Sequence, residues 1–272
     1  MYDIHNHLLS DLDDGPRELE TSLAMARMAA ENGTTHMACT PHASSAFTFQ
    51  PEQIAARLEA LRTAIADAGI ALTLGQGCDF HLSYDNIQDA LAHPHKYTLN
   101  GGDYLLIELP DQIVPPTLDR TIYDLRVVGM TPILTHPERN PALQRSPDRL
   151  RALVASGLLV QVTANSVTGG MGRTAQALAR ELLEKRWVHF LASDAHDLER
   201  RPPDLRGARE WVATHVSERY AELLTLHNPK AAWESRPLPE QMPMLGFAEA
   251  FEQEDFEDTR PLPWWRKLLG SR

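Results

Sequence analysis

Nine histidine and carboxylate side chains recur along this chain, most of them where a predicted strand ends. The histidines at positions 5 and 7 are two residues apart, and the period of two along a strand puts both imidazoles on one side, where they suit one metal ion. The same spacing separates the aspartate at 194 from the histidine at 196. The full candidate set is His5, His7, Asp14, His42, Asp79, Glu108, His136, Asp194 and His196.

Each of these motifs has a less specific interpretation when taken alone. Two histidines can share a strand by chance, and Asp194 with His196 could be capping residues before a helix. Independent accidents would not keep selecting the same end of each strand, so we interpret the set as a metal site. Mixed imidazole and carboxylate ligands favour Mn, Fe or Zn over Ca. Nine ligands exceed the needs of one ion and indicate two or three divalent ions, which lower the pKa of bound water.

The elements that must position these residues alternate between strands and helices. Strand-like runs lie at residues 2–8, 35–42, 71–80, 104–110, 131–138, 159–167 and 188–196. Between them, proline and glycine punctuation predicts helices over residues 16–33 and 51–69, and amphipathic segments predict helices over 146–156 and 174–186. This alternation predicts an α/β protein with a mostly parallel sheet that closes into a TIM-like barrel. Barrel enzymes carry their active sites at the C-terminal ends of the strands.

Composition excludes several classes of function. The chain has 272 residues and a formal net charge of −11, which argues against a general nucleic-acid binder, because such proteins cluster Lys and Arg. Two cysteines are too few for a disulfide framework, and neither has an arginine six positions on, so the cysteine loop of thiol-dependent phosphatases is absent. The first residues do not resemble a signal peptide, and no apolar run is long enough for a membrane span. We therefore expect a cytoplasmic protein without membrane insertion.

Several short motifs follow one another along the chain. They are HNH at residues 5–7, DDG at 13–15, TPH at 40–42, GCDF at 77–80, IELP at 107–110, THPER at 135–139 and SDAH at 193–196 with a following RRPP. Taken together, they resemble the motifs of the polymerase and histidinol phosphatase (PHP) superfamily, and within it those of the tyrosine-protein phosphatases of bacterial capsule and exopolysaccharide operons. The resemblance extends in order from the first residue to about Pro229.

The resemblance implies a distorted (β/α)7 barrel, three metal ions and two phosphate-binding arginines, Arg139 and Arg201. Without it, each arginine could instead form a surface ion pair with Glu138 or Asp197. The family normally has Glu where this chain has Asp79, which is one methylene shorter. By position, the ions would be held by His5, His7, Asp79 and Asp194, by Asp79, Glu108 and His136, and by Asp14, His42 and His196.

We accordingly expect hydrolysis of a phosphate monoester, with Mn as the expected ion and phosphotyrosine on a protein, such as a bacterial tyrosine kinase, as the substrate. One alternative is a small-molecule phosphatase of the same superfamily, acting on histidinol phosphate, a nucleotide or a sugar phosphate. Another is a metal-binding regulator of polysaccharide export with little turnover. The sequence does not indicate an oligomeric state. We expect the PHP domain to span residues 1–232 and a Pro-rich, acidic tail to span 233–272. The tail is expected to be weakly ordered or packed on the barrel, with a short helix over 245–251.

Overall fold

The computed structural model describes residues 1–247, and within them every strand pairing is parallel. One sheet has three strands in the order β1-β2-β4, and the other has six in the order β3-β5-β6-β7-β8-β9. The protein is therefore an α/β fold built on parallel sheets, as predicted. The strands are β1 (Tyr2–Asn6), β2 (His36–Cys39), β3 (His42–Ala43), β4 (Thr73–Gln76), β5 (Asp79–His81), β6 (Tyr104–Glu108), β7 (Thr131–Thr135), β8 (Leu159–Thr163) and β9 (Phe190–Ala192).

Two of the predicted strand runs are each divided into two shorter strands. Thr40 and Pro41 separate β2 from β3, and Gly77 and Cys78 separate β4 from β5. Proline has no backbone N–H to donate to a neighbouring strand, which accounts for the first interruption. As a result β2 and β4 pair in the small sheet, while β3 and β5 continue into the large one. A single isolated bridge between Asn6 and Ala195 links β1 to the segment after β9.

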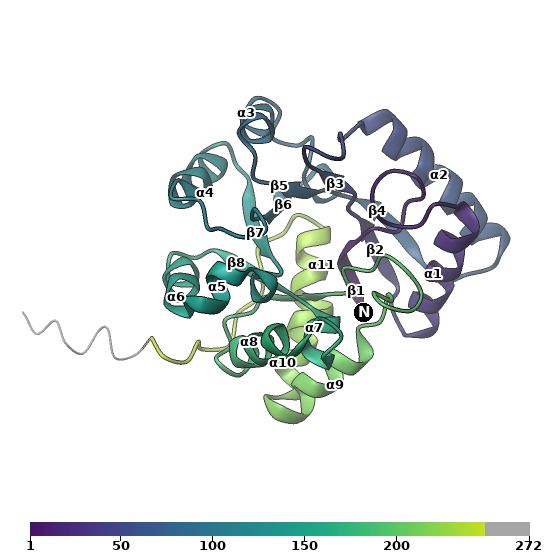
Figure 1. Cartoon of the computed structure of the whole chain (residues 1–272). Coiled ribbons are helices and arrows are strands. Elements are labelled where there is room, and N and C mark those ends of the chain that lie inside the picture. The colour runs from purple at the N-terminus through teal and green to yellow at the C-terminus, as the bar shows by residue number, and fades with distance from the viewer. Residues whose placement is uncertain (248–272) are drawn as a thin grey trace, which may run out of the picture.

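Helices surround the strands, as Figure 1 shows, and none of those in the described residues is both long and apolar enough to cross a bilayer. Their bounds are α1 (Leu19–Glu31), α2 (Pro51–Asp67), α3 (Tyr84–Ala92), α4 (Leu118–Val127), α5 (Pro141–Arg145), α6 (Pro147–Ala155), α7 (Ala164–Thr168), α8 (Arg173–Glu184), α9 (Arg206–His215), α10 (Glu218–Glu222) and α11 (Asn228–Trp233), with short turns η1 (Leu99–Gly101), η2 (Pro137–Arg139) and η3 (Leu223–His227).

The four predicted helices are confirmed as α1, α2, α6 and α8. Helix α2 begins at the predicted proline, Pro51, and is followed by Gly69 with a φ of 62°, a left-handed conformation that glycine adopts without steric cost. The predicted strand over residues 159–167 was too long, because α7 begins at Ala164. The buried Glu138 carboxylate accepts hydrogen bonds from the Thr163 N–H and the Ser166 hydroxyl, which stabilise this helical turn.

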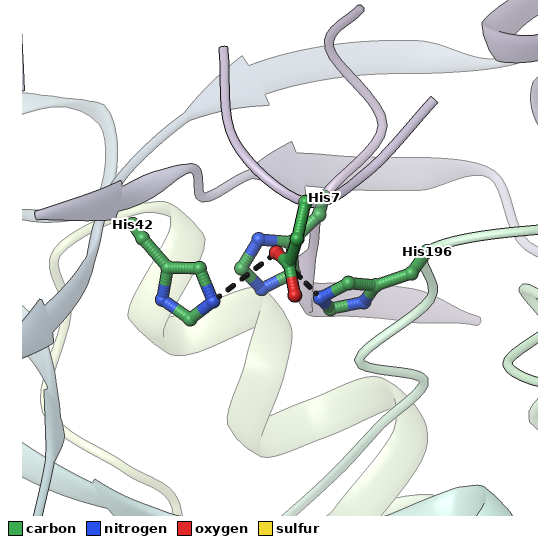
Figure 2. A group of neighbouring side chains, drawn as sticks. His7, His42 and His196 are labelled. Atoms are coloured by element: carbon green, nitrogen blue, oxygen red, sulfur yellow. Dashed lines mark ion pairs between the residues drawn. The ribbon is translucent and has the colours of Figure 1, made fainter. Parts of the chain in front are cut away.

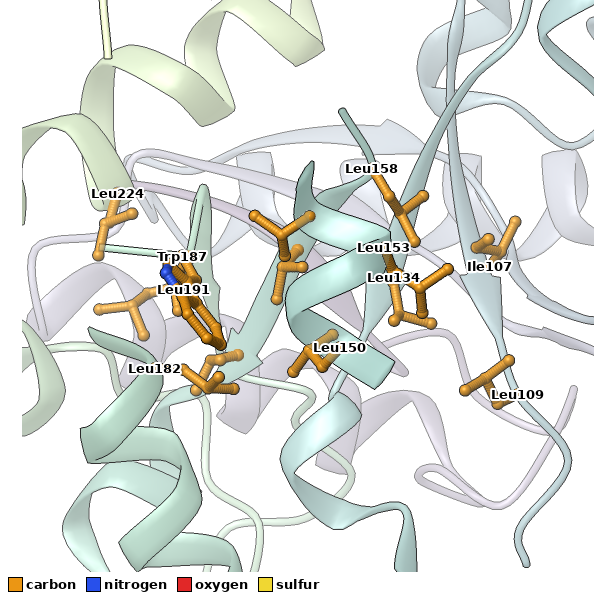
Figure 3. Packing of buried hydrophobic residues seen from close by; sticks show 14 of the residues in the cluster. Ile107, Leu109, Leu134, Leu150, Leu153, Leu158, Leu182, Trp187, Leu191 and Leu224 are labelled. Atoms are coloured by element: carbon orange, nitrogen blue, oxygen red, sulfur yellow. The ribbon is translucent and has the colours of Figure 1, made fainter. Parts of the chain in front are cut away.

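Alternating strand residues contribute to two different hydrophobic clusters. Leu105 and Ile107 of β6 belong to the large cluster that packs the strands against the surrounding helices, shown in part in Figure 3. Leu106, between them, belongs to a second cluster together with Ile4 of β1 and Phe190 of β9. Side chains alternate between the two faces of a strand, so those of Leu105 and Ile107 point away from that of Leu106. Because the second cluster contains residues of both sheets, the two sheets share one interior core.

Helix α11 covers the N-terminal ends of the first strands. The Trp233 ring meets the rings of Tyr2 and His36 edge-on, with centroids 6.0 and 5.3 Å apart. The chain beyond α11 continues along the body, where Leu245 accepts a hydrogen bond from the Trp187 indole N–H. Leu245 and Gly246 form a bend instead of starting the predicted helix, and residues 248–272, which include the rest of that predicted helix after Phe247, lie outside the described residues.

Candidate metal centre

The predicted ligands gather at the C-terminal ends of the strands. Asp14 comes from the loop between β1 and α1, and each of the other eight residues lies in, at the end of, or just after a strand or its continuation. All nine belong to overlapping groups whose ligand atoms lie within 4.8 Å of one another. The groups are His7, Asp14, His42 and His196; His5, Asp79 and His136; His5, His7 and Asp194; and His42, Asp79 and Glu108.

Asp79 lies at the centre of the cluster. Its Oδ2 atom is 3.3 Å from Nδ1 of His42, 3.4 Å from Nε2 of His5 and 3.9 Å from Nε2 of His136. Two ligand atoms that are each about 2.1 Å from one ion are separated by roughly 3.0 to 3.4 Å at octahedral or tetrahedral angles. The two shorter contacts match this spacing, so the side chain of Asp79, although shorter than Glu, reaches several potential ligands.

A second part of the cluster surrounds the half-exposed carboxylate of Asp14. Its Oδ1 atom is 3.2 Å from Nε2 of His196 and 3.4 Å from Nε2 of His42. The His7 ring lies beside the His196 ring, with centroids 3.9 Å apart. Figure 2 shows the three imidazoles from separate chain segments pointing toward one another. The structure thus brings Asp14, His42 and His196 together, with His7 beside them.

Several of these atoms are buried without a hydrogen bond. Among the described residues, Oδ2 of Asp79, Nδ1 of His42 and Nε2 of His196 have no hydrogen-bond partner. A buried polar atom without a partner costs about 1 to 3 kcal/mol, so such atoms are rare unless they bind something. The imidazole and carboxylate donors are those that Mn, Fe and Zn prefer. The residues therefore fit divalent metal ions.

The charges within the cluster shift its pKa values in opposite directions. Burial opposes the charged form of His5, but the surrounding aspartates outweigh it and raise the pKa to about 10. Burial and the Asp79 carboxylate together raise the pKa of Glu108 to about 8. Burial and the charge of Arg139 lower the pKa of His136 to about 4. The raised pKa values of His5 and Glu108 both reflect neighbouring carboxylates, whose negative charge a bound cation would offset.

Two of the clustered residues have unusual backbone conformations. His136 has a φ of 31° and Asp194 a φ of 52°, both in the left-handed region that residues other than glycine rarely adopt. His136 directly follows β7, and Asp194 lies two residues after the end of β9, so both unusual conformations occur where the chain leaves a strand. Backbone strain of this kind concentrates at functional sites.

Two arginines reach the edge of the cluster and share one carboxylate oxygen. The guanidinium groups of Arg139 and Arg201 both contact Oδ2 of Asp194, and Nη2 of Arg201 does so at 2.6 Å. The other oxygen of Asp194, Oδ1, lies 3.5 Å from Nε2 of both His5 and His7. Asp194 therefore joins the histidine cluster to the arginines, and both arginines line the adjacent cleft.

The arginines do not form the ion pairs that the sequence left open as an alternative. Glu138 accepts its hydrogen bonds from residues of β8 and α7, as described above. The Asp197 carboxylate accepts hydrogen bonds from the backbone N–H groups of Glu199, Arg200 and Arg201. Asp197 thus holds the loop that carries Arg201 and leaves the guanidinium group directed at Asp194.

The predicted site did not include the residues that orient His5 and His7. Nδ1 of His7 lies 2.7 Å from Oδ2 of the buried Asp13, and Nδ1 of His5 lies 2.9 Å from Oε1 of Gln161. Asp13 stands in the DDG motif beside Asp14, so the motif contained a signal for it. Gln161 is 156 positions from His5, and only the folded chain brings them together.

Asp13→Asn should weaken metal binding about 10- to 100-fold, because a carboxylate bonded to the far nitrogen of a ligating histidine fixes the ring and raises its basicity. Competition with a chelator of known affinity measures this loss. Asp11→Asn is the matched control, since this exposed carboxylate two residues earlier pairs only with Arg57 among the described residues. Equal metal affinities for the two variants would contradict the role of Asp13.

The two cysteines are not positioned to react with a ligand in the cleft. Cys39 and Cys78 are completely buried free thiols and do not line the cleft. Burial raises the pKa of Cys39 to about 12 and holds that of Cys78 well above its usual range. Reactive cysteines are instead accessible and ionise easily.

Alkylation with iodoacetamide should therefore leave hydrolysis of phosphate esters unchanged, because both thiols are inaccessible and protonated. Turnover before and after treatment measures this, with mass spectrometry of the intact protein as the control for modification. Complete inactivation at one modified cysteine, together with an inactive but folded Cys39→Ala variant, would show that a thiol takes part.

The chain is similar to several known proteins. Residues 1–234 match the family model for capsular polysaccharide synthesis, CpsB/CapC. The chain is 33% identical to the tyrosine-protein phosphatase YwqE of Bacillus subtilis, over 74% of this chain and 79% of the relative. It is 28% identical to the tyrosine-protein phosphatase CpsB of Streptococcus pneumoniae, over 85% of this chain and 97% of the relative.

Solved structures give the same result. A crystal structure from work on YwqE of Bacillus subtilis and CpsB of Streptococcus pneumoniae, described as metal-dependent tyrosine phosphatases, matches 90% of this chain and 98% of its own with a TM-score of 0.84 and 28% identity. An organophosphorus hydrolase variant from Deinococcus radiodurans matches 85% of this chain with a TM-score of 0.53 and 12% identity, which is a similarity of fold alone.

Proposed function

The chain belongs to the CpsB/CapC family of capsular polysaccharide synthesis, and on this basis we propose that it is a metal-dependent protein-tyrosine phosphatase. One observation carries the proposal: nine potential ligand side chains lie in overlapping groups beside a cleft, and two arginines line that cleft. Two of the relatives matched are named tyrosine-protein phosphatases, and the matching crystal structure is described as metal-dependent. The reaction is the hydrolysis of a phosphate monoester.

The nine clustered residues are proposed to hold two or three divalent ions, with Mn as the expected ion. A bridging role for Asp79 is supported by its membership of two ligand groups, since its Oδ2 atom lies 3.4 Å from Nε2 of His5 and 3.3 Å from Nδ1 of His42. When bound, such ions lower the pKa of a coordinated water and offset charge on phosphate oxygens. The Asp14 group, which also contains His42 and His196, supports a separate ion nearer the cleft opening.

The arginines are proposed to bind the phosphoryl group of the substrate. Arg139 and Arg201 contact the same oxygen of Asp194 and line the same cleft, so a phosphate beside Asp194 would meet both guanidinium groups. A planar guanidinium can donate two hydrogen bonds to phosphate oxygens and stabilise the charge that develops as the ester bond breaks. Phenolate is a better leaving group than an alkoxide, since the pKa of its phenol is near 10.

The substrate is proposed to be phosphotyrosine on a protein that acts in polysaccharide synthesis, such as a bacterial tyrosine kinase. Support comes from the family's role in capsule synthesis and from the names of the relatives. Because kinases of this kind use cytoplasmic nucleotides, we place the reaction in the cytoplasm. Two free thiols fit a reducing compartment.

The proposed catalytic domain spans residues 1–232 and is a distorted (β/α)7 barrel. The division of two strand runs into β2 with β3 and β4 with β5 supports a count of seven strand units. The bridge between Asn6 and Ala195, and the interior cluster shared by both sheets, support closure between β1 and β9. Residues 233–272 are proposed to form a Pro-rich, acidic tail that follows this domain.

A substrate panel tests the proposed function. Protein loaded with Mn²⁺ should hydrolyse a phosphotyrosine peptide with a higher kcat/KM than a phosphoserine peptide or histidinol phosphate, and release of inorganic phosphate measures all three. A preference for histidinol phosphate would replace the proposal with a small-molecule phosphatase. Metal binding without turnover on any substrate would identify a regulator instead.

A further inference from the structure

The cleft beside the metal cluster contains one aromatic hydrocarbon side chain. Among the described residues that line it, Phe47 is the only apolar one, and the others carry carboxylate, imidazole, guanidinium or hydroxyl groups. The cleft has a volume of about 350 Å³. Ligand sites commonly use apolar and aromatic side chains to contact the apolar part of a ligand, so Phe47 is the candidate for such a contact in this cleft.

Hydrogen bonds at the start of the loop that follows β3 hold Phe47 in place. The Ser44 N–H donates to the Phe47 carbonyl at 2.9 Å, and the Ser44 hydroxyl accepts from the N–H groups of Ala46 and Phe47. The Phe47 ring stacks on the His42 ring, with centroids 5.9 Å apart and an angle of 14° between planes. Because His42 belongs to the cluster, the phenyl face is held directly beside the proposed catalytic centre.

The position of this ring corresponds to the part of phosphotyrosine that follows the phosphate. In phosphotyrosine the aromatic ring is bonded to the ester oxygen, so a phosphoryl group at Arg139 and Arg201 puts the ring in the same cleft. Both arginines and Phe47 line that cleft. In phosphoserine the same oxygen carries a methylene group, which offers far less apolar surface to Phe47.

We propose that Phe47 is a specificity-determining residue that contacts the aromatic ring of aryl phosphates and so favours phosphotyrosine over phosphoserine. The inference rests on the proposed phosphatase function and deepens it. Offset aromatic contacts and burial of a ring together favour binding by roughly tenfold. Since the contact is made before and during the reaction alike, its loss acts mainly on KM.

The experiment compares Phe47→Ala with Phe49→Ala, each loaded with Mn²⁺. Phe49 lies two residues further on, does not line the cleft, and packs its ring on Tyr97 with centroids 4.9 Å apart. Phe47→Ala should raise KM for phenyl phosphate about tenfold with little change in kcat. Its kcat/KM for a phosphoserine peptide should stay at the wild-type value, and Phe49→Ala should match the wild type on both. Phe47→Tyr should retain the preference for aryl substrates.

Binding of phenylphosphonate and methylphosphonate, measured by calorimetry, provides a readout that does not depend on turnover. Phe47→Ala should lose roughly tenfold in affinity for phenylphosphonate and keep its affinity for methylphosphonate. Equal losses for both ligands, or no loss for either, would overturn the role of Phe47. If the wild-type protein bound phenylphosphonate more tightly than methylphosphonate but hydrolysed no phosphate ester, the result would support the role of Phe47 and refute the proposed function.

Discussion

Asp79→Asn should lower kcat/KM for a phosphotyrosine peptide by on the order of 10³-fold or more, since metal ions contribute several kcal/mol of transition-state stabilisation. Asp79 is fully buried, and its Oδ2 atom lies near ring nitrogens of three histidines. Asparagine keeps the shape of the side chain but removes the charge that a bridging ligand supplies. The variant should also contain fewer metal equivalents per chain than the wild type, as measured by elemental analysis.

Asp3→Asn is the matched control for Asp79→Asn. Asp3 is also a buried carboxylate at the sheet interior, but it accepts hydrogen bonds from Ser193 and belongs to none of the ligand groups found in residues 1–247. Asp3→Asn should change the free energy of unfolding and leave the metal content per chain unchanged. If Asp79→Asn kept full activity and metal content, the bridging assignment would be wrong.

Arg139→Ala and Arg201→Ala should each lower kcat/KM for the same peptide by about 30- to 1000-fold, which corresponds to about 2 to 4 kcal/mol for one lost charge-assisted contact. Metal content should stay normal, because neither arginine belongs to a ligand group. Lysine at either position should restore only part of the activity, since a point charge replaces a two-pronged donor.

Arg200→Ala is the matched control, because Arg200 is an exposed neighbour of Arg201 that does not line the cleft. It should behave as the wild type. Wild-type efficiency in both Arg139→Ala and Arg201→Ala would remove these residues from substrate binding, while leaving the metal cluster itself untouched. A fall in metal content would instead show that they act through Asp194.

Much of the site could be predicted because its geometry follows from the parallel strands. Parallel strands place their C-terminal ends at one edge, so a histidine or carboxylate at each strand end enters the same space. The structure brings together His5 and Asp194 in this way, although 189 positions separate them. Eight of the predicted ligands needed only the strand positions and not the details of packing, whereas Asp14 lies in the loop between β1 and α1.

Other parts of the site depend on packing that periodicity does not encode. Gln161 looks like any polar residue of a strand, and its contact with His5 exists only because β8 faces β1 across the interior. The helical turn of α7 was predicted as strand, because its stabilising partner, Glu138, lies in a different segment. Phe47 belongs to none of the sequence motifs, and only the folded structure shows that it lines the cleft.

The most direct test of a metal-dependent phosphotyrosine hydrolase is turnover of a phosphotyrosine peptide by chelator-stripped protein during titration with Mn²⁺. Turnover should be negligible before metal is added and should rise until more than one equivalent per chain is bound, because the ligand set exceeds the needs of one ion. The same titration of Asp79→Asn should give little recovery. Full turnover by protein that elemental analysis shows to be free of metal would contradict the account.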